Sequence, residues 1–152
     1  MLSYSSGPAA ALLEKTIYEI LLATEVRIPN GLAIVSRHQG LRLSWRNLRE
    51  RADETARGLW GIGIRPADRI GMWSTSCAEW LYLQIAASRI GAVLVNINPA
   101  YRAHDLRHVL LRSRIKVLFM HEADRRANYV EILEEARRGQ PIELERTVLL
   151  GT

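Results

Sequence analysis

The chain has 152 residues, of which 48% are hydrophobic and 24% are charged. These proportions are those of an ordinary globular domain and exclude a disordered chain. The single cysteine excludes an intrachain disulfide and favours a reducing, cytoplasmic location.

The net charge of +5 raises the question of nucleic acid. Most arginines, however, are interleaved with acids, as in Arg49/Asp53 and Asp53/Arg57, which have the i,i+4 spacing of ion pairs on a helix surface. No one-sided basic stripe with stacking aromatics is visible, so we expect no nucleic-acid partner. The most apolar window, residues 80–97, is interrupted by polar residues and glycine, which argues against a membrane span.

The first predicted elements are a helix and a hairpin. Thr16 and Glu19 have the spacing of a capping box at the start of a helix. Residues 32–36 and 41–45 are rich in β-branched and apolar residues around a turn, and they are predicted to form a hairpin. Ser44 is then placed to cap the next helix.

Short apolar strands alternate with amphipathic helices through the rest of the chain. Ser76 and Glu79 have the spacing of a second capping box, and we expect them to open the helix after the first of these strands. The alternation predicts an α/β fold with a largely parallel sheet flanked by helices on both faces. The predicted strands of this sheet are residues 69–74, 92–97, 116–120 and 147–151.

Several residues could carry chemistry, but each also has a structural explanation. His104 and His108 have a spacing that can hold a metal, yet nothing nearby supplies a third ligand, and exposed histidines explain them better. Cys77 falls in the first turn of a helix, where the dipole favours a thiolate, but no base is indicated, and a packed, inert cysteine is the better explanation. We therefore predict no metal site and no catalytic residue in this chain.

The carboxyl ends of the predicted strands are the better place for a site, because ligands of open α/β sheets bind there. Asn96, Asn98 and Tyr101 end one strand, and Ser74 and Thr75 end another. Asparagine and proline also form turns without any function, so both explanations stay open.

Four segments in order resemble the adenylate-forming (AMP-binding) superfamily, and within it the acyl-CoA synthetases, or fatty-acid–CoA ligases. The segments are "LRLSWRNL" (41–48), "IGIRPADRIGMWSTSCAEWL" (62–81), "ASRIGAVLVNINPAYRAHDLRHVL" (87–110) and "KVLFM" (116–120). The opening "LSYSSG" with the later "KTIYEIL" is similar to ligases of the medium-chain type.

The resemblance implies an enzyme that activates a small-molecule carboxylic acid with ATP and Mg²⁺. The acyl-adenylate would then pass its acyl group to coenzyme A. The phosphate loop, the magnesium segment and the C-terminal domain of the family would follow residue 152, so residues 1–152 are expected to be an incomplete AMP-binding domain. This expectation makes the chain a truncated fragment that is inactive alone.

The resemblance also implies one weaker assignment. In acetate-type members an arginine after the strand that corresponds to "KVLFM" contacts a phosphate of coenzyme A. Arg125 and Arg126 lie in that neighbourhood, and Tyr101 belongs to the same region. Two alternatives to a ligase fragment stay open: a non-catalytic interaction or scaffold module, and half of a split ligase completed by a second chain.

Overall fold

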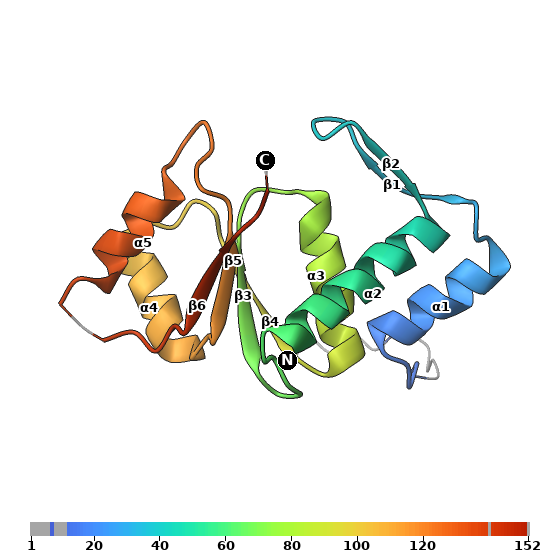
Figure 1. Ribbon diagram of the computed structural model, residues 1–152, viewed down its shortest axis with the longest axis horizontal. Helices are drawn as coiled ribbons and strands as arrows, with labels where there is room; N and C mark the ends of the chain where they lie inside the picture. The colour runs from blue at the N-terminus through green and yellow to red at the C-terminus, as the bar shows by residue number, and fades with distance from the viewer. Residues whose placement is uncertain (1–6, 8–11, 140, 152) are drawn as a thin grey trace, which may run out of the picture.

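The fold contains two sheets and five helices in the part of the chain that the computed structural model describes, residues 7, 12–139 and 141–151 (Figure 1). A four-stranded sheet with the order β4-β3-β5-β6 is parallel throughout, and β1 and β2 form a separate antiparallel hairpin. The predicted α/β class is therefore confirmed. The helices are α1 (Ile17–Arg27), α2 (Trp45–Gly61), α3 (Ala78–Ile90), α4 (Ala103–Ser113) and α5 (Tyr129–Arg137), and the strands are β1 (Leu32–Ser36), β2 (Leu41–Ser44), β3 (Arg69–Trp73), β4 (Val93–Ile97), β5 (Val117–Met120) and β6 (Arg146–Leu149).

The order of the strands explains why helices cover both faces of the sheet. The chain steps from β3 to its neighbour β4, and then steps back across β3 to reach β5 and β6. Because crossovers between parallel strands are right-handed, a reversal of direction places the crossover helix on the opposite face. Accordingly, α3 lies on one face together with α2 and α1, whereas α4 and α5 lie on the other (Figure 1).

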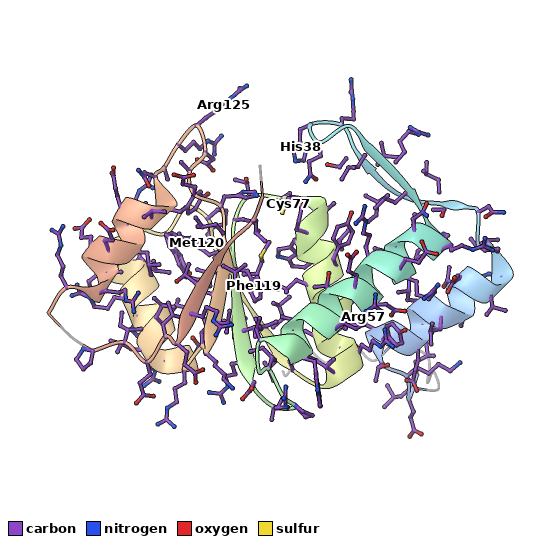
Figure 2. The ribbon with its side chains drawn as sticks, in the orientation of Figure 1. His38, Arg57, Cys77, Phe119, Met120 and Arg125 are labelled. Carbon is purple, nitrogen blue, oxygen red and sulfur yellow. The ribbon has the colours of Figure 1, made fainter. Side chains whose placement is uncertain are left out.

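Successive side chains of β5 point to the two faces and build two separate cores. Val117 and Phe119 belong to the core under α2 and α3, while Leu118 and Met120 belong to the core under α4 and α5 (Figure 2). All four side chains are buried. A strand buried on both faces is expected to be continuously apolar, as "VLFM" is.

The predicted hairpin and the caps of the first two helices are confirmed. Thr16 accepts a hydrogen bond from the backbone N–H of Glu19, whose carboxylate accepts one from the N–H of Thr16 in return. Ser44 and Asn47 form the same reciprocal arrangement at the start of α2. Gly40 takes a positive φ of 66° in the turn of the hairpin, as glycine does readily. No helix of the described segments is long and apolar enough to cross a membrane.

The predicted capping box at the start of α3 is wrong. The N-cap residue is Cys77, whose side chain makes no capping hydrogen bond, so Ser76 stands one position too early to cap the helix. The side-chain oxygen of Gln39, in the hairpin turn, accepts the hydrogen bond from the backbone N–H of Ala78 instead, at 2.9 Å. A partner 39 residues away replaces the local cap.

The predicted ion pair between Arg49 and Asp53 forms, but Asp53 is only 9% exposed and does not belong to a solvated face. Its carboxylate accepts hydrogen bonds from Arg49 at 2.7 Å, from the hydroxyl of Tyr18 in α1 at 2.7 Å, and from Arg89 in α3. Arg49 also pairs with Glu25 in α1 at 2.7 Å. One buried carboxylate therefore joins three helices.

Replacing Asp53 with alanine should lower the free energy of unfolding by about 2–4 kcal/mol, because it leaves two guanidinium groups and a phenol without their shared acceptor. Glu54→Ala is the matched control, since Glu54 forms only an exposed pair with Arg51 and should change stability by less than about 0.5 kcal/mol. Urea unfolding of both variants measures the difference. Equal effects would contradict a structural role for the Asp53 network.

Candidate functional site

The carboxyl end of β3 is the point where the connections of the sheet diverge. The loop after β3 leads to α3 on one face, while the loops after its neighbours β4 and β5 lead to α4 and α5 on the other (Figure 1). Ligands of open α/β sheets bind at such switch points, outside the carboxyl ends of the strands. Three loops, residues 74–77, 98–102 and 121–128, meet at this edge.

Trp73 forms a rigid base under the three loops. Its side chain is fully buried, and its indole N–H donates to the carbonyl oxygen of Asn98 at 3.2 Å. Its ring meets the ring of Tyr129, at the start of α5, edge to face with centroids 4.7 Å apart. The last residue of β3 thus fixes both the loop after β4 and the helix after β5.

The hairpin turn reaches the same edge through Gln39. The side-chain oxygen of Gln39 accepts from the hydroxyl of Ser36 at 2.7 Å as well as from Ala78, and its amide donates to the carboxylate of Glu79 at 2.8 Å. Burial acts to raise the pKa of Glu79, but hydrogen bonds from its own backbone N–H and from Gln39 outweigh burial, so the pKa is lowered. Figure 2 shows His38 at the tip of this hairpin, on the same side of the molecule as Cys77.

A tight turn after β5 presents Arg125 and Arg126. The carboxylate of Asp124 accepts from the backbone N–H groups of Arg126 at 2.7 Å and Ala127 at 3.0 Å, and from the hydroxyl of Tyr129 at 2.8 Å. These hydrogen bonds lower the pKa of Asp124, and the one from the backbone N–H of Arg126 has the largest effect. Both arginine side chains are exposed, and Arg125 projects from the tip of the loop (Figure 2).

Arg102, which the sequence-based assignment did not include, also acts on this part of the edge through its charge. Burial and the hydrogen bond to Asp124 raise the pKa of Tyr129 to about 12, while the charges of Arg102 and Arg126 act to lower it. Both guanidinium groups therefore act on the same phenol. Within the described residues, no carboxylate lies within ion-pair distance of Arg102, Arg125 or Arg126. Arginines that form no ion pair with a carboxylate are suited to bind an anionic group such as a phosphate.

The sequence-predicted polar residues at this edge have mainly structural roles. The side chain of Asn98 accepts from the N–H of Ala100 at 2.9 Å and so forms the turn itself. Ser74 is buried and donates to the carbonyl of Thr75 at 2.8 Å. Asn96 is an exposed residue within β4, and the half-buried ring of Tyr101 packs against the core under α4 and α5.

The structure shows the surroundings of the two candidates for reactive chemistry, Cys77 and His104. Burial raises the pKa of the Cys77 thiol, which disfavours a thiolate. The side chain of His104 is 95% exposed, and no group of three potential metal ligands occurs among the residues that the structure describes. The edge therefore offers cations and backbone groups for binding, and we find no nucleophile or metal centre in the described segments.

Residues 24–150 match the family of AMP-binding enzymes. The chain belongs to this family. Among its curated relatives, the mitochondrial medium-chain acyl-CoA ligase ACSF2 of Rattus norvegicus is 37% identical over 145 residues, and its Homo sapiens counterpart is 35% identical over 135 residues. The matched part covers 92% and 88% of this chain but only 24% and 22% of those proteins.

Solved structures show the same fold. The N-terminal domain of FACL13 from Mycobacterium tuberculosis superposes with a TM-score of 0.80 at 23% identity, and covers 88% of this chain and 33% of that one. The anthranilate CoA ligase AuaEII superposes with a TM-score of 0.78 at 22% identity, over 92% of this chain and 26% of that one. The predicted resemblance to the adenylate-forming acyl-CoA synthetases is thus confirmed, and the chain spans about a quarter of the length of the curated relatives named above.

Gln39→Ala should release the hairpin turn from α3 and lower the free energy of unfolding by about 1–2 kcal/mol, because the first N–H of the helix loses its acceptor. Hydrogen exchange at the Ala78 amide should accelerate in this variant. Arg37→Ala, an exposed neighbour in the same turn, is the control and should leave that exchange rate unchanged. Unchanged exchange in Gln39→Ala would contradict the proposed cap.

The raised pKa of Tyr129 makes a prediction at alkaline pH. Folding favours the neutral phenol, so its contribution is fully present below the unfolded pKa of 10.0 and is lost as the pH rises through about 12. A shift of this size corresponds to about 2–3 kcal/mol. Tyr129→Phe should therefore flatten the fall in unfolding free energy over this range, as measured by urea unfolding at several pH values. An unchanged pH dependence in the variant would contradict this assignment.

Proposed function

We propose that the chain supplies the N-terminal part of an ATP-dependent medium-chain acyl-CoA ligase. The ligase would convert a carboxylic acid to an acyl-adenylate and then to a coenzyme A thioester. The observation that carries this proposal is the 37% identity to the rat medium-chain ligase, which extends over 92% of this chain. The structural neighbours support the fold alone, because they are less than 25% identical.

On this proposal, residues 1–152 are an incomplete AMP-binding domain that is inactive by itself. Adenylation brings two anionic reactants together, and it requires cations and hydrogen-bond donors around the phosphates. On the same proposal, Mg²⁺ and the phosphates of ATP are bound by the rest of the enzyme. The chain would contribute the framework and one wall of the substrate site.

On this proposal, the chain also contributes residues that bind coenzyme A. We assign Arg125 and Arg126 to a phosphate of that cofactor, and Tyr101 to the same region of the edge. Arg102 is added to the group because it acts on the same phenol as Arg126 and because no carboxylate in the described segments neutralises it. The fixed turn at Asp124 supports the assignment, since it holds both arginine backbones in place before any ligand binds.

The activity is tested with a chimera in which this chain replaces the matched quarter of the rat ligase. With ATP, Mg²⁺, coenzyme A and a medium-chain acid, the chimera should form the thioester. The isolated chain should show neither thioester formation nor ATP–pyrophosphate exchange. Exchange by the isolated chain, or a folded chimera without activity on any carboxylic acid, would contradict the proposed function.

The coenzyme A assignment is tested by the double substitution Arg125→Ala and Arg126→Ala in the chimera. Loss of one charge-assisted contact with a phosphate, worth about 1.5–3 kcal/mol, should raise the KM for coenzyme A at least about tenfold and leave ATP–pyrophosphate exchange unchanged. Arg137→Ala, an exposed residue at the far end of α5, is the control. An unchanged KM for coenzyme A would show that neither arginine contacts a phosphate of coenzyme A.

A separately encoded second chain is the remaining way to complete the enzyme, and activity that appears only on adding such a chain would demonstrate it. The mammalian relatives are named as mitochondrial proteins, so a cytoplasmic location stays a prediction for this chain.

A further inference from the structure

We propose that Asp124 and Tyr129 are positioning residues for the binding of coenzyme A. They fix the turn of residues 123–128, which we call the arginine turn because it carries Arg125 and Arg126, and they keep the acid of this turn from neutralising its two arginines. The inference rests on the proposed function, because the ligand of these arginines is the coenzyme A of that reaction. Neither positioning residue needs to touch the ligand, since both act through the arginines.

The arginine turn is a small closed loop. Backbone pairing between Ala123 and Asn128 closes it, and the N–H of Asp124 donates to the carbonyl of Ala127 at 2.9 Å. Asp124 is the only acidic residue within 123–128 and stands directly before the two arginines. An aspartate this close to two arginines can pair with one of them, and such a pair would compete with a phosphate for the guanidinium group.

The carboxylate of Asp124 is instead occupied by other donors. Its Oδ1 accepts from the backbone N–H groups of Arg126 at 2.7 Å and Ala127 at 3.0 Å, and its Oδ2 accepts from the hydroxyl of Tyr129 at 2.8 Å. Among the residues that the structure describes, Asp124 forms no ion pair. The carboxylate therefore shapes the turn and yet leaves both guanidinium groups available to a phosphate.

Tyr129 fixes the direction of the second carboxylate oxygen. Its ring is fully buried and meets the buried ring of Trp73 edge to face, so the hydroxyl is held by the sheet and cannot follow movements of the loop. Figure 2 shows Arg125 projecting from the tip of this loop, away from the buried ring. Without the hydroxyl, Oδ2 of Asp124 would be free to turn toward the guanidinium groups of the same turn.

The substitution Tyr129→Phe tests this arrangement in the chimera, because it keeps the buried ring and removes only the hydroxyl. It should raise the KM for coenzyme A about twofold to fivefold, the effect of an exposed ion pair that competes with the ligand, and leave kcat and ATP–pyrophosphate exchange unchanged. Tyr82→Phe, which removes a half-buried hydroxyl from α3, is the control and should leave this KM unchanged. An unchanged KM in Tyr129→Phe would overturn the proposal.

Two substitutions of Asp124 separate its charge from its role in shaping the turn. Asp124→Asn keeps an oxygen that accepts from the two backbone N–H groups but removes the charge, so adding it to Tyr129→Phe should restore the KM of the parent chimera. Asp124→Ala also removes the acceptor and should raise the KM about fivefold or more, because the turn is no longer held. Glu122→Gln removes a neighbouring exposed charge and is the control, which should not restore the KM of Tyr129→Phe. A raised KM that persists in Tyr129→Phe with Asp124→Asn would overturn the withheld charge.

Hydrogen exchange in the isolated chain separates this inference from the proposed function. The amides of Arg126 and Ala127 should exchange faster in Asp124→Ala and at nearly the original rate in Asp124→Asn, and equal rates in the two variants would overturn the inference. A chimera that forms no thioester, together with this exchange pattern, would contradict the proposed function alone. An active chimera in which Tyr129→Phe still raises the KM after Arg125 and Arg126 are replaced with alanine would overturn the inference alone, because Tyr129 would then not act through the arginines.

Discussion

Parallel pairing of β3 with both β4 and β5 determines where every other element of the large sheet lies. A parallel strand can be reached only through a crossover, and the fixed hand of crossovers converts the order β4-β3-β5-β6 into helices on both faces. The same pairing brings the carboxyl ends of four strands to one edge. The arginines after β4 and β5 therefore lie at the same edge, although more than twenty residues separate Arg102 from Arg126 in the chain.

Much of this architecture could be predicted from the sequence because its signals are local. Continuous apolar runs such as "VLFM" predict strands buried on two faces, and the pairs Thr16–Glu19 and Ser44–Asn47 lie within one helical turn of each other. The features that could not be predicted depend on distant partners. Gln39 replaces the expected cap of α3, and Asp53 is buried because Tyr18 and Arg89 come from other helices. Spacing along a single helix contains no information about either.

The same distinction between local sequence signals and distant partners applies to the candidate site. The carboxyl edge could be located from the order of the strands, and Tyr101, Arg125 and Arg126 were placed there by resemblance. Arg102 was not assigned from the sequence because an arginine at the start of a helix has no distinctive local pattern; only the fold brings its charge near enough to act on Tyr129. Of the two asparagines that first suggested a site, Asn98 instead forms the turn and accepts a hydrogen bond from Trp73, and Asn96 is an exposed residue of β4. The edge consequently presents exposed arginines beside a turn that the Asp124 carboxylate fixes, and the proposed contact with coenzyme A rests on this arrangement.

The Asp53 network also explains how α1 keeps its position although part of its surface is apolar and exposed. Packing alone would stabilise the position of such a helix only weakly, because its outer side is apolar and exposed to solvent. The inner side of α1 is instead tied by directional contacts, from Tyr18 to Asp53 and from Glu25 to Arg49, and its leucine at position 21 is buried against α2 and α3. These contacts fix the orientation of α1, and with it the positions of Ile17 and Ile20 beside β1. The buried carboxylate thus connects the position of α1 to the two helices that pack on the sheet.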